Sequence, residues 1–282
     1  MTIRAYAKIN IGLNVLGKRE DGYHNLETIF HRVNIYDEID LQPATTITLA
    51  STSAEVPSDD TNLCHRAAQL LARECRTIRG AQITLTKRIP VGAGLGGGSS
   101  DAAATLIGLN SFWSLNLSVE KLHECALQLG SDVPYFLRKK SALATGRGDI
   151  LEYFPLDIPF WILIVAPTIQ VSTAWAYRQL RLSDDRKIRL TTKLLLTGLD
   201  QPDELSHWIT NDFEQPVFTH HPELQQIKES LIDGGAIFAL MSGSGSAVYG
   251  FFTSRTTIEA ISADLGKHCR IFLTPPGFQP PE

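Results

Sequence analysis

The sequence is organised around one glycine-rich stretch, Pro90-Val91-Gly92-Ala93-Gly94-Leu95-Gly96-Gly97-Gly98-Ser99-Ser100-Asp101-Ala102-Ala103-Ala104. Five of the seven residues from Gly92 to Gly98 are glycine, and a run of helix-forming residues follows at once. Before the stretch, residues 81–87 alternate between apolar and polar side chains, a pattern that predicts a strand. The stretch is therefore typical of a loop that joins a strand to a helix.

The start of the predicted helix suits an anion. Ser99 and Ser100 stand where an N-cap residue belongs, and Asp101 suits the first turn. Glycine allows positive φ and a close approach to a ligand, while the first N–H groups of a helix lie at the positive end of its dipole. A surface turn is the alternative, but so many glycines destabilise the chain unless φ or close approach requires them. We therefore expect a phosphate group here.

This loop differs from two common phosphate loops. The Walker pattern requires a lysine, and no lysine follows any of these glycines. The dinucleotide pattern is met literally by Gly92, Gly94 and Gly97, but any loop this dense in glycine meets it. The nearest acid at the distance of a ribose-binding residue is Glu120, which stands at a predicted helix start. A dinucleotide-binding oxidoreductase remains an alternative, as does a nucleotide-binding regulator without turnover.

Composition excludes several other classes of protein. With 282 residues, of which 43% are hydrophobic and 20% charged, the chain is typical of a soluble protein with one large domain or two modest ones. A net charge of -4 argues against nucleic acid as the main partner. No apolar run approaches the roughly 18 residues of a membrane helix, so we expect neither a signal peptide nor a membrane span, and a cytoplasmic location. The scattered cysteines predict free thiols rather than a zinc site or disulfides: Cys64, Cys75, Cys125 and Cys269.

The opening residues predict a strand followed by a polar turn. Residues 3–16 alternate as a half-buried strand should, which puts Lys8 and Asn10 on one face. A lysine in such a pattern is more often a solvated edge charge than a functional residue. The turn that follows presents Tyr23 and His24 side by side, and aromatic residues of this kind either pack locally or stack on a flat heterocycle.

The remaining patterns predict a mixture of strands and helices in two domains, residues 1–157 and 158–282. In an alternative division, the last ten or so residues belong to the first domain. Asn62 and Asp132 each precede a predicted helix, so an N-cap is the simpler interpretation of both. The further strands are expected at 26–34, 36–41, 46–50, 141–145, 150–153, 160–165, 237–241, 247–252 and 270–273. The helices are expected from residue 63, after the glycine loop, and at 118–129, 172–182, 190–199, 222–233 and 256–265.

Several motifs in order resemble the kinase superfamily that includes galactokinase, homoserine kinase and mevalonate kinase. They are Ala7-Lys8-Ile9-Asn10, Asp21-Gly22-Tyr23-His24, the loop 90–103, Gly130-Ser131-Asp132-Val133-Pro134 and Met241-Ser242-Gly243-Ser244-Gly245. The Asp-Gly-Tyr-His segment is the most specific one. It is similar to the cytidine-binding part of one branch, which phosphorylates the 2-hydroxyl of a cytidine-diphosphate ester of methylerythritol in the non-mevalonate isoprenoid pathway.

The resemblance implies an α+β fold of two domains with the active site between them. The N-terminal domain would be similar to ribosomal protein S5 domain 2, and the C-terminal domain would be ferredoxin-like. ATP with Mg²⁺ would be the cofactors, without metal ligands that the motifs specify, and the enzyme would be a monomer or weak homodimer. Another small-molecule kinase of the superfamily is the alternative function.

The resemblance also implies roles for individual residues. Lys8 and Asp132 would be catalytic, and Asn62 would lie near the adenine. The ATP phosphates would be held by Pro90, Val91, Gly92, Ala93, Gly94, Leu95, Gly96, Gly97, Gly98, Ser99 and Ser100. The cytidine substrate would contact Asn10, Tyr23, His24 and Tyr177, with Trp175 as the alternative to Tyr177. The closing loop carries Ser242 and Ser244 where the superfamily commonly has threonine, which keeps both hydroxyls.

Overall fold

The computed structural model describes residues 1–181 and 192–281. These residues form two compact units, each assembled from separate parts of the chain. The first unit comprises Met1–Ala7, Ile35–Val91 and Gly96–Lys139, and the second comprises Lys8–Asn34, Gly92–Leu95 and the chain from Lys140 onward. The expected helices at 172–182 and 190–199 include residues 182, 190 and 191, which lie outside the described residues.

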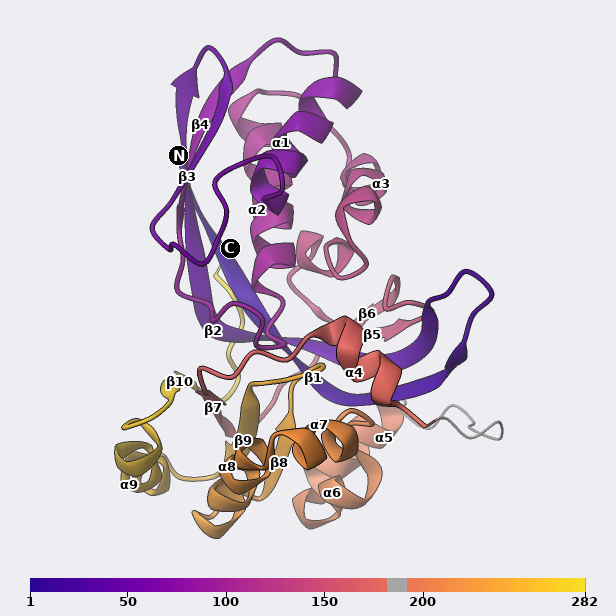
Figure 1. Ribbon diagram of the computed structural model, residues 1–282, viewed down its shortest axis with the longest axis vertical. Helices are drawn as coiled ribbons and strands as arrows, with labels where there is room; N and C mark the ends of the chain where they lie inside the picture. The colour runs from indigo at the N-terminus through magenta and orange to yellow at the C-terminus, as the bar shows by residue number, and fades with distance from the viewer. Residues whose placement is uncertain (182–191, 282) are drawn as a thin grey trace. The chain divides into compact units, whose positions relative to one another are not determined.

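The first unit packs helices against a small sheet. Strand β4 (Gly80–Thr86) pairs in parallel with β3 (Ile47–Ser51) and antiparallel with the later part of β2 (His24–Ala44). The helices are α1 (Leu63–Glu74), α2 (Gly97–Phe112), α3 (Val119–Leu129) and the short η1 (Pro134–Leu137). Figure 1 shows α1, α2 and α3, which pack against one another, on the same side of β3 and β4. The glycine loop therefore leads from β4 into the central helix of this group.

Helix α2 begins three or four residues earlier than the sequence predicts. Its N-cap is Gly96, with φ of 69°, rather than Ser99 or Ser100. Ser100 is buried, and its hydroxyl donates a hydrogen bond to the carbonyl of Tyr6 at 2.7 Å. Asp101 is likewise buried and lies beyond the first turn. Glycine in the left-handed region turns the chain into the helix early, so no side-chain cap is formed.

The second unit contains a four-stranded antiparallel sheet in the order β10-β7-β9-β8. Its strands are β7 (Trp161–Ala166), β8 (Phe238–Met241), β9 (Val248–Phe252) and β10 (Arg270–Thr274). The described helices of this unit are α4 (Thr173–Gln179), α5 (Thr192–Asp200), η2 (Pro202–Glu204), α6 (Leu205–Trp208), α7 (Glu214–His220), α8 (Pro222–Asp233) and α9 (Arg255–Leu265). A hairpin of β5 (Ser141–Thr145) and β6 (Ile150–Phe154) pairs with the first part of β2.

Helix α8 illustrates why this unit folds. Proline opens the helix, where its missing N–H is not needed, and Leu224, Ile227 and Leu231 follow at helical spacing. All three side chains are buried in one cluster with Leu163 and Val165 of β7. Each such side chain contributes about 1.5–3 kcal/mol when it leaves water. The apolar stripe therefore fixes the helix on the sheet.

Two predictions about local structure are wrong, and three short helices were not predicted. Strand β1 (Thr2–Lys18) is buried on both faces between Ala5 and Leu13 rather than on one, so Lys8 and Asn10 are not at a solvated edge. The two strands expected at 26–34 and 36–41 are one strand, because Ile35 continues the extended backbone. The helices η2, α6 and α7 are too short to give a readable period.

The cysteines match the prediction of free thiols. Cys64, Cys75, Cys125 and Cys269 are free thiols, and the first and third of them are buried. Among the described residues, no helix combines the length and the apolar character that a membrane span requires.

Candidate active site

The glycine loop approaches another part of the second unit at Gly94. This residue has φ of +75°, and a Cβ built on it would lie 2.1 Å from the carbonyl oxygen of Ser242. The carbonyl of Gly94 accepts hydrogen bonds from Lys8 Nζ at 3.2 Å and from Ser242 Oγ at 3.0 Å. Glycine is thus required at this position by contacts within the protein itself.

The start of α2 offers donors for an anion. The N–H of Ser100 donates to the carbonyl of Gly96 at 2.9 Å, which is the first hydrogen bond of the helix. The N–H groups of Gly97, Gly98 and Ser99 precede it and have no partner within the helix. Gly98 is exposed. N–H groups without a partner in the helix, at the positive end of its dipole, fit a phosphate, and phosphate binding here stays a prediction.

Lys8 is buried in the second unit and is held by neutral oxygens. Its ammonium donates to Asn10 Oδ1 and to the carbonyl of Gly94, and it lies 5.0 Å from the ring centroid of Phe30. Only 4% of Lys8 is exposed. These contacts fix the position of a cation that an exposed lysine would leave variable.

Asn10 is held from three directions. Its amide nitrogen Nδ2 donates to Thr28 Oγ1 at 2.8 Å, and its backbone N–H donates to Ser242 Oγ at 3.3 Å. The hydroxyl of Tyr249 donates to the Asn10 carbonyl at 3.0 Å. Burial raises the pKa of the Tyr249 hydroxyl well above its usual range, so it keeps its proton. Lys8, Asn10 and Gly94 are therefore brought together within the second unit.

The sequence did not single out Asn211, which organises the β8–β9 loop. Its Nδ2 donates to the carbonyls of Met241 at 2.8 Å and Gly243 at 2.7 Å, while its Oδ1 accepts from the N–H of Phe213 at 2.9 Å. The loop joins antiparallel strands and is a hairpin turn. A buried asparagine between short helices gives no periodic signal, and only its polar character in an apolar region could have marked it.

Asp132 lies in the first unit between α3 and η1. The N-cap of η1 is Val133, without a side-chain cap, so the interpretation of Asp132 as an N-cap is wrong. The Ser131 hydroxyl donates to Asp132 Oδ1 at 3.5 Å, and Asp132 is half-buried. A capping role therefore does not explain this carboxylate.

Asn62 does cap a helix. Its Oδ1 accepts from the N–H of Cys64 at 2.8 Å at the start of α1, and its Nδ2 donates to the carbonyl of Pro57 at 2.7 Å. Both ends of the amide are thus bonded within the first unit. The simpler interpretation from the sequence is confirmed, and the position beside adenine remains a proposal.

Aromatic side chains gather in the second unit. The rings of His24 and Tyr177 are stacked, with centroids 4.7 Å apart and an angle of 19° between planes. Burial, with a smaller contribution from Lys18, lowers the pKa of His24, which favours the neutral imidazole at pH 7. Phe213 meets the Tyr177 ring edge-on at 4.9 Å. Tyr177 is therefore the residue that the fold brings to His24.

The other two aromatic candidates contact different side chains. Tyr23 is 56% exposed, and the guanidinium of Arg147 lies 4.8 Å from its ring centroid. Trp175 contacts His220, with ring centroids 4.8 Å apart. Within the described residues, no group of three His, Cys, Asp or Glu side chains is placed to hold a metal ion.

Two family models match this chain. The model for the GHMP kinases N terminal domain matches residues 62–140, and the model for GHMP kinases C terminal matches residues 193–271. The fold and the glycine loop before a helix start agree with these matches, so the chain is a GHMP kinase. The predicted two-domain α+β class is confirmed.

Full-length relatives narrow the family further. A 4-diphosphocytidyl-2-C-methyl-D-erythritol kinase of Chlorobium phaeobacteroides is 45% identical over 282 residues, covering 99% of this chain and 96% of that protein. A protein of the same name from Prosthecochloris aestuarii is 44% identical over 281 residues, 99% of this chain and 98% of that protein. The chain belongs to the 4-diphosphocytidyl-2-C-methyl-D-erythritol kinase family.

Solved structures agree with this assignment. A crystal structure of 4-(cytidine 5'-diphospho)-2C-methyl-D-erythritol kinase has a TM-score of 0.85 and 34% identity, covering 99% of this chain and 100% of that one. Homoserine kinase from Cytophaga hutchinsonii has a TM-score of 0.73 at 18% identity, covering 98% and 95%. The second likeness is one of fold alone.

Proposed function

We propose that the protein transfers the γ-phosphoryl group of ATP to the 2-hydroxyl of 4-diphosphocytidyl-2-C-methyl-D-erythritol, a step of the non-mevalonate isoprenoid pathway. The stacked pair of His24 and Tyr177 carries the substrate assignment. A neutral imidazole has one N–H donor and one acceptor nitrogen, which suits the polar edge of cytosine, and a tyrosine ring provides a stacking face. Tyr23 and Asn10 complete the proposed substrate contacts, and Tyr177 is preferred over Trp175.

The start of α2 is the proposed position of the ATP phosphates. The N–H groups that have no partner within the helix lie in the segment from Pro90 to Ser100, and Asn62 would approach the adenine. Mg²⁺ would neutralise charge on the β- and γ-phosphates when bound, held mainly by phosphate oxygens and water. The two family models fall on either side of residue 157, which supports the proposed domains 1–157 and 158–282.

The chemistry needs a hydroxyl that is oriented, a group that accepts its proton, and a positive charge near the phosphoryl oxygens. Asp132 is the proposed proton acceptor, because a cap does not account for it. Lys8 is the proposed cation, with its ammonium fixed by Asn10 and Gly94. In a loose transition state the proton leaves late, so orientation matters more than basicity.

A coupled assay for ADP release tests the function. We expect release that depends on the cytidine diphosphate substrate, with mevalonate and homoserine as control acceptors at the same concentration. Equal release with either control would assign another kinase of the superfamily instead. If reduced nicotinamide cofactor protects the protein against unfolding and ATP does not, the result would favour the oxidoreductase. The proposed cytoplasmic location is tested by assaying cell fractions for the protein. Gel filtration tests the proposed monomer or weak dimer.

A further inference from the structure

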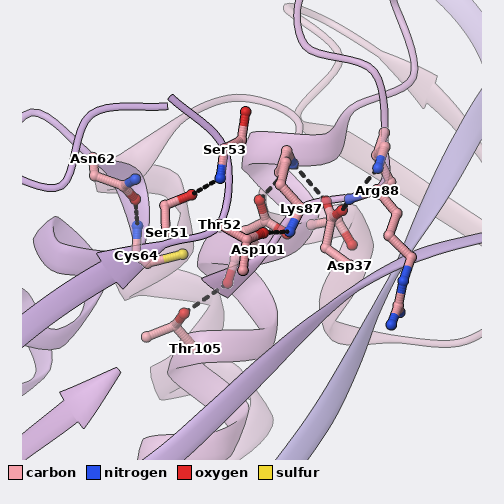
Figure 2. Close-up of polar contacts among 12 residues, drawn as sticks. Asp37, Ser51, Thr52, Ser53, Asn62, Cys64, Lys87, Arg88, Asp101 and Thr105 are labelled. Carbon is pink, nitrogen blue, oxygen red and sulfur yellow. Dashed lines mark hydrogen bonds and ion pairs between the residues drawn. The ribbon is translucent and has the colours of Figure 1, made fainter. Parts of the chain in front are cut away.

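A buried ion cluster in the first unit links the two ends of the glycine-rich segment (Figure 2). The ammonium of Lys87 donates to Asp37 Oδ2 and, at 2.7 Å, to Asp101 Oδ2. The exposed fractions of the three side chains are 6%, 0% and 3% in the order Lys87, Asp37, Asp101. The cluster is therefore shielded from solvent, where ion pairs are screened much less than at the surface.

Asp37 fixes the chain just before the loop. Its Oδ1 accepts hydrogen bonds from the backbone N–H groups of Arg88 and, at 2.8 Å, of Ile89. Together with Lys87, these bonds attach three successive residues to one carboxylate on β2. Because Pro90 follows at once, the entry of the loop is anchored at its base.

Asp101 attaches the other end of the segment. It lies in α2, four residues after Gly97, and its ion pair with Lys87 joins the helix to residues 87–89. A Cβ built on Gly97 would lie 2.9 Å from Lys87 Nζ and 3.0 Å from Ile89 Cγ2. The ammonium therefore lies directly against the first residue of the helix.

The same contacts argue against Lys87 as a direct ligand of phosphate. Burial works against its charge, but the two carboxylates outweigh that effect and keep the pKa of Lys87 above its usual range. Burial also raises the pKa of the Asp101 carboxyl, whose Oδ1 is buried and accepts no hydrogen bond from the described residues. The charge of Lys87 is thus balanced by two carboxylates inside the protein. Lys87 can therefore affect a ligand only through the position of the backbone.

We propose that Lys87 is a positioning residue for ATP, which with Asp37 and Asp101 holds the loop entry against α2 and so fixes the N–H groups of Gly97, Gly98 and Ser99. This inference rests on the proposed function, in which those groups bind the ATP phosphates. Misplacement of binding groups by about 1 Å can cost as much as 100-fold in the rate that depends on them. Such positioning requires that the chain be held by contacts both before and after the glycine loop.

The test is calorimetric titration of the full-length protein with a non-hydrolysable ATP analogue. We expect Lys87→Met to weaken analogue binding at least about tenfold, while the KM of the cytidine substrate at saturating ATP changes less than about twofold. Lys267→Met is the matched control, because Lys267 is exposed, lies in the turn after α9 and pairs with Asp264 at the end of that helix. It should bind the analogue like the wild type.

A second variant separates positioning from folding. Lys87→Met leaves two buried carboxylates without their cation, which destabilises the unit, whereas Lys87→Met/Asp101→Asn removes one of these charges and should regain part of the melting temperature. The link between residues 87 and 101 stays broken, so we expect analogue binding to remain weak. Recovery of affinity together with the melting temperature, or normal affinity of Lys87→Met, would overturn the proposal. A wild type that binds the analogue but does not phosphorylate the cytidine substrate would instead overturn the proposed function.

Discussion

The two glycine- and serine-rich loops look alike in sequence but differ in what they contact. The loop before α2 leads into an exposed glycine, Gly98, in the first turn of the helix, and into N–H groups without partners in the helix. The β8–β9 loop is buried throughout, and its hydroxyls bond to the protein: Ser242 to Gly94, Ser244 to Thr173 and Ser246 to Ile169. Composition alone therefore does not define a binding loop, because glycine serves close packing of backbones as well as close approach of a ligand.

The largest expected effect is on folding, at the point where the loops meet. Gly94→Val places a branched side chain at φ of +75° and 2.1 Å from the Ser242 carbonyl. Backbone strain and the clash together should lower the free energy of unfolding by about 3–5 kcal/mol, measured by urea denaturation. Gly17→Val is the control, since a Cβ at Gly17 would meet nothing within 4 Å. A stable Gly94→Val variant would show that the two loops do not need this contact.

The second prediction tests whether the phosphoryl-transfer step depends on Asp132, which lies in neither of the two loops. Asp132→Asn keeps the shape of the side chain but removes the proposed proton acceptor, so kcat should fall at least about 100-fold, or about 2.7 kcal/mol of barrier. Steady-state kinetics at saturating ATP measures it. Because Val133 is the N-cap of η1, the substitution removes no helix cap. Near-normal kcat would remove Asp132 from the chemistry.

Ser242→Ala should have an intermediate effect on stability. The hydroxyl donates to the carbonyl of Gly94 and accepts from the N–H of Asn10, and it is fully buried. Its removal leaves the buried Asn10 N–H without that acceptor, which costs about 1–3 kcal/mol in urea denaturation. Ser230→Ala, at an exposed helix position, should stay within about 0.5 kcal/mol of the wild type. A loss no greater than that of the control would contradict a supporting role for the β8–β9 loop.

Much of the fold follows from local pattern, whereas parts of the candidate site depend on contacts distant in sequence. Alternation of apolar residues locates β4, and helical spacing locates α8. The ion pair of Lys87 with Asp37 joins residues 50 positions apart, and Asn211 bonds to carbonyls about 30 positions away. No period or motif encodes such pairs. A Cβ at Gly97 would also clash with Lys87, another contact that the sequence does not reveal. Gly97→Val would therefore disturb the protein itself as well as any contact with ATP.

The smallest expected effect is also the sharpest test of the comparison, because it should change stability and binding in opposite directions. At Gly98, a new Cβ would meet only Leu63 Cδ1, at 3.6 Å, which is ordinary contact. Gly98→Ala should therefore stabilise α2 by up to about 1 kcal/mol, since glycine within a helix costs about 0.5–1 kcal/mol relative to alanine. If the ATP phosphates approach this backbone closely, the same methyl group should weaken binding of a non-hydrolysable ATP analogue. Calorimetry of the melting transition and of the titration measures both quantities, and Gly17→Ala, in strand β1, is the control. A variant that is more stable and binds the analogue as tightly as the wild type would mean that Gly98 does not touch the phosphates, and that the loop before α2 serves packing as the β8–β9 loop does.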